Sequence, residues 1–298
     1  MRITDSMRMR LTLADLGNIN AENSRLLQQE GTGKKLLRPS DDPSGAIRQL
    51  RLHSDIQQQA DEKTRIATGV DTIQNTSLAL DDVVSVLQSA KELGVQGATS
   101  SLSTSEFQAI ATQADQLLKQ MVDIANRKAG DSYLFSGTAT TTQPFTTTGS
   151  PVSAVTYNGD GNYQQLLLSP GTTVSLNLPG SQVFTTGQNV FQALIDLRDA
   201  AQNQDVQALS STVSGELDTA FNQTVNNRTQ VNAVQSRLSQ ETSSLDQISL
   251  SSKQLLSNVE DADVVDVLTK LQLTSAQRTA TLQAIAKVSQ ATLLDYLA

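Results

Sequence analysis

The residues that could carry out chemistry are few and do not form a catalytic set. The chain contains one histidine, His53, and no cysteine. Without cysteine it cannot form a disulfide, a zinc-thiolate site or a cysteine nucleophile. A single histidine cannot supply both metal ligands of a His-Glu-x-x-His helix, and no partner for acid–base catalysis is evident. His53 follows the apolar position Leu52, so we expect it at the surface or at the edge of a helix seam, and we predict that the protein is not an enzyme.

Three short stretches resemble ligand sites, and each is better explained as a local structural signal. Residues 31–34, Gly-Thr-Gly-Lys, lack the spacing of a phosphate-binding loop and predict a turn or helix break. Residues 41–43, Asp-Asp-Pro, are typical of a helix start, with Asp42 as the N-cap and Pro43 in the first turn. The loop 158–162, Asn-Gly-Asp-Gly-Asn, has a single carboxylate, too few for an EF-hand calcium site. We therefore predict no metal and no cofactor.

A fourth cluster is acidic and lies near the C-terminus. Glu260, Asp261, Asp263 and Asp266 fall within seven residues. Carboxylates are favoured at the start of a helix, where they complement its dipole. The cluster therefore predicts the start of a last helix at about residue 260, and the alternative interpretation is a contact surface for another subunit or a chaperone.

The composition restricts the class of protein further. The chain has 298 residues, of which 38% are hydrophobic and 3% aromatic, a balance that suits slender helices with narrow apolar seams. The net charge of −8 leaves no basic face for nucleic acid. No apolar run is long enough to span a membrane, and residues 1–10 lack the apolar core of a cleaved signal. On composition and targeting signals alone, the chain would be placed in the cytosol.

Hydrophobic spacing divides the chain into a helical, a β-rich and a second helical zone. An apolar 4-3 repeat from Leu52 to Leu87 predicts a long coiled-coil-like helix, which the glycines at 94 and 97 end. Ser103 and Glu106 form a candidate capping box for a second helix, antiparallel to the first. Prolines and aromatic residues concentrate between 131 and 187, where 155–157 and 163–168 predict a hairpin around the loop 158–162.

The two ends of the chain carry weaker helical signals than the middle. A long helix is predicted to about residue 257, and a last helix from about 260 has an apolar register that includes Leu268 and Ile285. The N-terminal register contains Leu13 and Leu16, but asparagines interrupt it at 20 and 23. Helices with such thin seams are marginal in water on their own. We therefore expect the two ends to become ordered by pairing with each other or with neighbouring molecules.

Several motifs in this sequence resemble the bacterial flagellin superfamily. Residues 1–3, the stretch from Gly31 to Pro43 and the helix around 80–94 are similar to the flagellin N-terminal region, with glycine at 31 where serine is usual. Residues 259–263, Val-Glu-Asp-Ala-Asp, are similar to the C-terminal signature. The stretches 133–138, 143–145, 155–160 and 293–297 resemble the filament-side hook-associated proteins, the branch that forms the hook–filament junction, more than flagellin itself.

The resemblance implies a function, a location and a set of partners. Members of this branch are exported unfolded through the flagellar type III apparatus without cleavage of a signal, so the expected location is the extracellular flagellum instead of the cytosol. There they form a homo-oligomeric ring between the hook-side adaptor junction protein and flagellin. A cytosolic export chaperone is implied for the C-terminal region. No nucleic acid and no membrane insertion are expected.

The expected fold is mainly α: an elongated, flagellin-like rod with long coiled-coil-like helices from both chain ends and a small inserted β domain at the tip. We expect residues 1–44 and 258–298 to form a terminal assembly domain, 45–130 and 188–257 a helical bundle, and 131–187 the β insert. The assembly face is predicted from apolar positions in the two end helices, namely Leu13, Leu16, Leu27, Leu268, Leu271, Leu282 and Ile285.

Three alternatives remain open at this point. The first is a flagellin filament subunit, which shares the terminal motifs. The second is an enzyme carried by the β insert, which the lone histidine and the lack of a metal motif argue against. The third is an adhesin whose β insert binds a ligand or a host surface.

Overall fold

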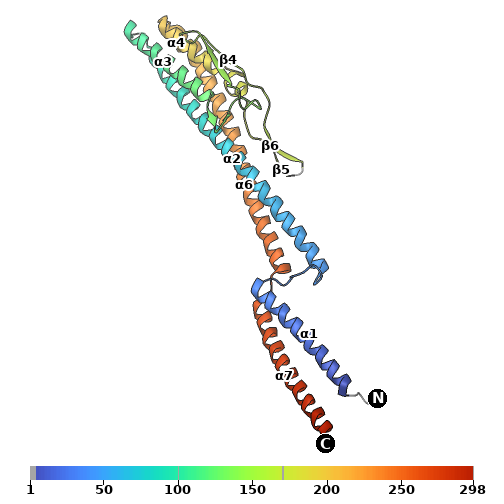
Figure 1. The fold of residues 1–298 in the computed structure, drawn as a ribbon. Helices are drawn as coiled ribbons and strands as arrows, with labels where there is room; N and C mark the ends of the chain where they lie inside the picture. The colour runs from blue at the N-terminus through green and yellow to red at the C-terminus, as the bar shows by residue number, and fades with distance from the viewer. Residues whose placement is uncertain (1–4, 100, 170, 298) are drawn as a thin grey trace. The chain divides into compact units, whose positions relative to one another are not determined.

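The computed structural model describes residues 5–99, 101–169 and 171–297 and is built mainly of helices. Figure 1 shows the long helices and the small strands between them. The helices are α1 (Asp5–Thr32), α2 (Pro43–Gly97), α3 (Thr104–Ala125), α4 (Val190–Gln202), α5 (Val206–Ala208), α6 (Ser214–Glu260) and α7 (Val264–Leu297), with π turns at Ser181–Thr185 and Leu209–Val213. The strands are β1 (Lys128–Ala129), β2 (Ser132–Tyr133), β3 (Phe145–Thr148), β4 (Ala154–Tyr157), β5 (Gln165–Ser169) and β6 (Thr172–Ser175). The predicted helix–β–helix order is confirmed.

The chain divides into two compact units. Unit 1 comprises residues 1–59 and 246–298, and unit 2 comprises residues 60–245. Residues 43–59 of α2 and 246–260 of α6 belong to unit 1, and the rest of both helices belongs to unit 2. Helices α1 and α7 belong to unit 1 alone. The finer division into three domains remains a prediction.

The core of unit 2 forms where the heptad seams of α2, α3 and α6 meet. On α6 five buried positions are seven residues apart, and Ala220 and Asn227 are buried between them, as the 3-4 spacing of a coiled-coil seam requires: Leu217, Thr224, Val231, Leu238 and Leu245. Polar contacts fix α6 antiparallel to α2, since Ser77 donates to Asn232 over 3.0 Å and Lys91 pairs with Asp218 over 2.6 Å. The predicted seam of α2 is confirmed by the burial of Ile66, Ile73, Leu80 and Leu87.

Helix α3 begins and packs as its sequence predicts. The Ser103 hydroxyl accepts from the backbone N–H of Glu106, whose carboxylate in turn accepts from the backbone N–H of Ser103. This reciprocal capping box satisfies two N–H groups that the first helical turn leaves without a partner. An ion pair of 2.6 Å between Arg127 and Asp82 holds the region after α3 beside α2, and the Ile110 side chain lies close to Gly97, so α3 runs antiparallel to α2 as predicted.

The strands pair differently from the sequence prediction. β4 pairs with β3, placing Thr147 opposite Val155, and β5 pairs with β6, placing Leu166 opposite Val174. The predicted hairpin between 155–157 and 163–168 is therefore wrong. The physical reason lies in the loop after β4, where the Asp160 carboxylate accepts from the backbone N–H and the hydroxyl of Thr138. These bonds hold the loop against the segment after β2, so the chain does not reverse onto β4.

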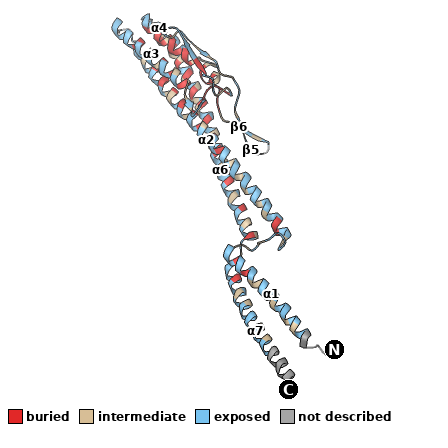
Figure 2. Ribbon diagram, in the orientation of Figure 1, coloured by how far each residue is buried: buried red, intermediate tan, exposed pale blue. Residues whose placement is uncertain are grey.

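An aromatic cluster joins the β-rich segment to α4. Phe135, Phe145, Phe184 and Phe191 are fully buried, and Phe145 lies 5.1–5.2 Å from Phe184 and Phe191 between ring centroids. Buried aromatic rings contribute large apolar areas and further edge-to-face attraction. Figure 2 shows buried residues (red) gathered along α4 and the helices beside it. The strands therefore depend on the helices for their core.

Candidate assembly surface

Helices α1 and α7 run antiparallel and form the terminal pair of unit 1. The amide of Asn23 lies 3.4 Å from the Thr274 hydroxyl and 3.3 Å from the Ser275 hydroxyl, while Ala262 is paired with Gly33 further along. The first residues of α1 and the last of α7 consequently lie at the same end of the pair (Figure 1). Pairing of the two chain ends with each other, one of the two predicted alternatives, is present within a single chain.

The seam of this pair is thin. Leu26 of α1 and Val267 of α7 are 1% and 4% exposed, and these two are the buried apolar residues of α1 and α7 in the part of the chain whose side chains are described. Ile19 and Leu271 are half-buried. A contact of this size buries little apolar surface compared with a globular core, so packing stabilises the pair weakly.

The seven residues predicted as the assembly face fall into two groups. Leu16, Leu271 and Ile285 are half-buried. The other four are exposed by 39–51% of their surface and lie one or more positions off the buried residues: Leu13, Leu27, Leu268 and Leu282. Leu26 takes the buried position in place of Leu27, and Val267 takes it in place of Leu268. Their part in assembly remains a prediction.

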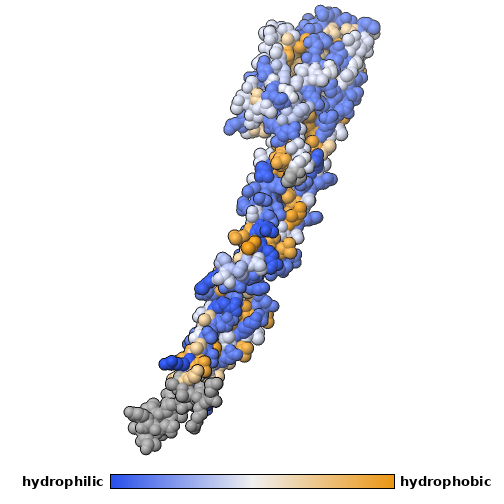
Figure 3. Space-filling view, turned by 90° about the vertical axis from the view of Figure 1, so that its right-hand side faces the viewer, coloured by the Kyte–Doolittle hydropathy of each residue, from blue (hydrophilic) through white to orange (hydrophobic). Residues whose placement is uncertain are grey.

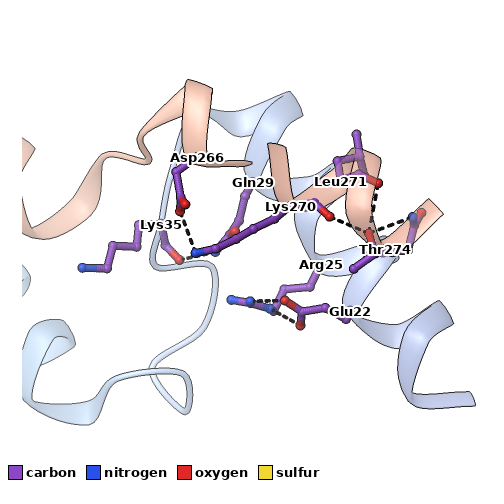
Figure 4. A network of polar contacts seen from close by, with 9 residues as sticks. Glu22, Arg25, Gln29, Lys35, Asp266, Lys270, Leu271 and Thr274 are labelled. Atoms are coloured by element: carbon purple, nitrogen blue, oxygen red, sulfur yellow. Dashed lines mark hydrogen bonds and ion pairs between the residues drawn. The ribbon is translucent and has the colours of Figure 1, made fainter. Parts of the chain in front are cut away.

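Polar contacts around the seam mostly stay within one helix. Glu22 and Arg25 form a two-point ion pair on α1, and Asp266 pairs with Lys270 over 2.6 Å on α7 (Figure 4). The hydrogen bonds from Arg25 hold the pKa of the Glu22 carboxyl below its usual value. Exposed pairs of this kind add a few tenths of a kcal/mol, roughly 0.2–0.5 each, to their own helix. They do little to hold the two helices together.

The two signature motifs from opposite ends of the chain meet at the base of this pair. Helix α1 ends at Thr32 because Gly33 adopts a φ of 67°, a conformation that glycine takes without strain. The backbone N–H of Lys35 donates to the Glu260 carbonyl over 2.6 Å, and that of Ala262 donates to the Gly33 carbonyl over 2.9 Å. The stretches at 31–43 and 259–263 therefore form a short antiparallel bridge.

A buried carboxylate closes this bridge. Glu260 is 7% exposed, and its side chain pairs with Lys34 on one oxygen and lies 3.4 Å from His53 Nε2 on the other. Lys34 also reaches Asp261 over 3.5 Å, and the bond to Glu260 raises the pKa of the Lys34 ammonium. We call Lys34, His53, Glu260 and Asp261 the clasp. Sequence periodicity misses it because its members are up to 227 positions apart.

Asp42, Asp263 and His53, which the sequence suggested as structural residues, have the roles predicted for them. Asp42 precedes Pro43, the first residue of α2, and its carboxylate accepts from the backbone N–H of Gly45 over 2.9 Å. That bond holds the pKa of the Asp42 carboxyl below its usual value. Asp263 caps α7 by accepting from the N–H groups of Val265 and Asp266. His53 has a half-exposed side chain at the clasp.

Most of the exposed apolar side chains belong to unit 1. Among the described residues, fourteen of the eighteen exposed large hydrophobic side chains lie there, although unit 1 is the smaller unit. Val265, Leu50 and Leu250 are exposed by 73%, 71% and 69%. On the face drawn in Figure 3, apolar patches (orange) reach the surface between hydrophilic ones. Apolar surface of this extent is typical of a region that binds protein.

None of the helices in the described part of the chain is long and apolar enough to cross a bilayer. Nor do three or more histidine, aspartate or glutamate side chains gather there in a way that could hold a metal ion. The exposed apolar surface of unit 1 is the candidate functional site.

Two family models match the chain, one at each end. The bacterial flagellin N-terminal helical region matches residues 3–140, and the bacterial flagellin C-terminal helical region matches residues 215–297. Together they take in α1, α2, α3 and α7 and all of α6 after its first residue. The two halves of the clasp lie one in each matched region.

Named relatives come from the same family. The chain is 28% identical over 190 residues to flagellar hook-associated protein 3 of Salmonella typhimurium, which covers 62% of this chain and 57% of the relative. It is 30% identical over 147 residues to the protein of the same name in Escherichia coli K12, covering 49% and 46%. The chain thus spans about half the length of the curated relatives it matches.

Solved structures share the fold. The Bacillus cereus FlgL structure is 25% identical with a TM-score of 0.61, and the match covers 70% of this chain and 99% of that one. A structure titled as the flagellar junction protein FlgL from Legionella pneumophila has a TM-score of 0.61 at 14% identity, covering 71% and 100%. The chain belongs to the bacterial flagellin family and, within it, resembles the hook-associated proteins.

Proposed function

We propose that this chain is a structural subunit of the bacterial flagellum that forms the junction ring between hook and filament. The observation that carries the proposal is the contrast between the exposed apolar side chains of unit 1 and its thin internal seam. A surface of this kind gains stability when copies pack side by side, and a homo-oligomer closes when each copy presents complementary faces to two neighbours. Similarity to the hook-associated relatives supports a flagellar assembly of this kind.

The mechanism is ordering coupled to assembly. In the single chain, α1 and α7 are joined by few buried apolar residues and by the clasp. Neighbouring copies would cover exposed positions such as Leu13, Leu27, Leu268 and Leu282, and the area removed from water would add to the thin seam. The favourable free energy of assembly therefore resides in the two end helices, and no catalytic step is required.

The proposed partners and location follow from the same assignment. The ring would contact the hook-side adaptor junction protein on one side and flagellin on the other. The chain would reach the outside of the cell through the flagellar export apparatus without a cleaved signal. A cytosolic chaperone would shield the apolar C-terminal region until export. We propose no enzymatic activity, nucleic acid or membrane insertion for this chain.

Immunoelectron microscopy of isolated flagella tests this proposal directly. An antibody against residues 131–187 should label one band between hook and filament. Label along the filament would instead assign the chain to flagellin, an alternative that rests on 25% identity over 126 residues to flagellin FlaB1 of Treponema pallidum. Absence of label from the whole flagellum would overturn both assignments.

Deletion of residues 258–298 tests the role of the terminal helices. The truncated chain lacks α7 and half of the clasp, so it should be absent from the junction even when it is produced and exported normally. Export is checked by its recovery from the culture medium. Normal junctions built from the truncated chain would contradict assembly through the end helices.

A further inference from the structure

A cavity in unit 2 lies between the β-rich segment, residues 131–187, and the helices α2 and α6. Its volume is about 210 Å³. Ile73 of α2 and Val231 of α6 line its floor and are each 2% exposed, and Val234 lies beside them on α6. At ~30 Å³ for each water molecule, the cavity has room for about seven waters or for one small ring.

Hydrogen bonds hold the opposite wall of the cavity in place. The Tyr163 hydroxyl donates to the side-chain oxygen of Gln182. The buried Asn177 side chain accepts from the backbone N–H of Gln164 over 2.7 Å and donates to the Gly137 carbonyl over 3.2 Å. These bonds fix the loop that carries Tyr163, so the cavity is formed in the free protein, as ligand pockets usually are.

A glycine on α2 lets the β5–β6 hairpin approach the helix closely. A Cβ atom at Gly69 would lie 2.8 Å from Leu176 and 3.2 Å from Leu166, so a larger residue would force the hairpin outward. The hairpin contributes Ser175, the last residue of β6, to the cavity lining. The position of this wall therefore depends on the close approach at Gly69.

The lining of the cavity is uncharged. Transfer of an ionic group from water into such a site is costly, because no opposite charge compensates for its lost hydration. Between residues 131 and 187 the sequence has two charged residues, Asp131 and Asp160, and neither lines the cavity. The polar lining consists of carboxamides and hydroxyls: Tyr163, Ser175, Asn177, Gln182 and Gln230.

This combination of groups suits a neutral sugar. A carboxamide has an oxygen acceptor beside an N–H donor, and neighbouring sugar hydroxyls, which both donate and accept, complement it. Gln230 is exposed and Gln182 is half-buried, so both carboxamides are accessible to a ligand. The apolar floor complements the C–H face of a sugar ring, and the ring of Tyr163, a residue that is 41% exposed, adds an aromatic surface.

We propose that this cavity binds one neutral sugar residue of a glycan. The sugar ring would lie against Ile73 and Val231, and its hydroxyls would bond to the carboxamides of Gln182 and Gln230. This binding function is additional to the proposed assembly function and does not depend on it, because the cavity lies in unit 2 and assembly is assigned to unit 1.

Saturation-transfer NMR of the purified full-length protein tests the site. The probes are the methyl glycosides of glucose, galactose, mannose, N-acetylglucosamine and N-acetylgalactosamine, and N-acetylneuraminic acid is the charged comparison. We expect at least one neutral glycoside to give a signal at least fivefold stronger than that of the charged sugar. Absence of signal from every neutral glycoside, or an equal signal from the charged sugar, would overturn the proposal.

Substitutions then place the bound sugar in the cavity. Gln230→Ala and Tyr163→Ala should each weaken binding of the glycoside at least fivefold. Gln240→Ala is the matched control, because it removes another exposed glutamine from the same helix, roughly 15 Å along the axis at 1.5 Å per residue, and should leave binding unchanged. Equal binding by the Gln230→Ala and Gln240→Ala proteins would show that the sugar binds elsewhere and would overturn the proposal.

The antibody label at the junction is measured independently of sugar binding. If the junction band is present and no glycoside binds, the sugar site is wrong while the junction assignment stands. If a glycoside binds in the cavity and the band is absent, the sugar site stands and the junction assignment is wrong.

Discussion

The two units are built from the same kind of amphipathic helix, but unit 2 buries its large apolar side chains whereas unit 1 leaves many of them exposed. In unit 2 the seams of α2, α3 and α6 meet one another and four phenylalanines, and in its described part only Leu78, Val95, Tyr163 and Leu167 remain as exposed large apolar side chains. In unit 1 the apolar residues Leu26, Ala46 and Val267 are buried and fourteen large ones are exposed. Unit 2 buries its apolar side chains within a single chain, whereas unit 1 has exposed apolar surface on which other molecules can pack.

The largest expected effect is the loss of the aromatic core of unit 2. Phe145→Ala should lower the free energy of unfolding by about 3–5 kcal/mol, because the ring is fully buried and contacts three other aromatic rings. Chemical denaturation followed by circular dichroism measures the change. A loss below about 1 kcal/mol would show that the β-rich segment does not depend on this cluster.

A smaller loss of stability is expected in unit 1, where fewer apolar side chains are buried. Leu26→Ala should destabilise the α1–α7 pair by about 2 kcal/mol, at the low end for a buried leucine because few neighbours surround it. Leu27→Ala is the adjacent control and should change stability by less than about 0.5 kcal/mol, since Leu27 is 51% exposed. Hydrogen exchange of the α1 and α7 amides reports both effects. Equal losses at the two positions would contradict the observed seam.

The clasp should contribute less than the apolar seam. Glu260→Gln removes the charge that Lys34 neutralises. We expect the free energy of unfolding of unit 1 to fall by about 1 kcal/mol, a small value because the Lys34 ammonium is 41% exposed and solvent screens the pair. Exchange of the Lys35 and Ala262 amides, which form the backbone bridge, should become faster. Lys91→Met in unit 2 is a matched control that removes a surface ion pair and should leave those two amides unchanged.

Acid should weaken both units through capping and loop carboxylates. Hydrogen bonds from Thr138 lower the pKa of Asp160, bonds from Ser103 lower that of Glu106, and a bond from the Ser257 side chain lowers that of Asp261. A carboxyl with a lowered folded-state pKa adds stability above its unfolded pKa, about 4, and loses it as pH falls through the folded value. Glu216 acts in the opposite direction, because burial raises its pKa.

Denaturation between pH 6 and pH 2 checks this pH dependence. Stability should fall below about pH 4, and Asp160→Asn should make the decline shallower. A decline that begins near pH 6, or one that Asp160→Asn leaves unchanged, would contradict the assignment.

Periodicity predicted the helices well because their seams are regular. Five buried residues of α6, from Leu217 to Leu245, are spaced seven positions apart, and the capping box of α3 is local in sequence. In the end helices the same signal fails to choose between adjacent apolar residues. Leu26 and Leu27, or Val267 and Leu268, fit the repeat almost equally well, and only the partner helix decides which is buried.

Contacts between distant residues were beyond the reach of sequence periodicity. The hairpin predicted around residues 158–162 is wrong because Asp160 bonds to Thr138, twenty-two residues earlier. The burial of Glu260 depends on Lys34 and His53 at the other end of the chain. The acidic composition around Glu260 predicted a helix start, and it could not distinguish a solvated carboxylate from one enclosed by Lys34 and His53.

We expect assembly to bury the exposed apolar surface of unit 1 and to leave the surface of unit 2 unchanged. Cysteine can be placed at Leu13 in unit 1 or at Leu78 in unit 2, which are 50% and 53% exposed and therefore matched. The measurement is the rate at which a thiol reagent modifies each position in the purified monomer and in isolated flagella. We predict that Leu13→Cys becomes at least tenfold slower in flagella while Leu78→Cys changes little. Equal rates for Leu13→Cys in both states would contradict the account.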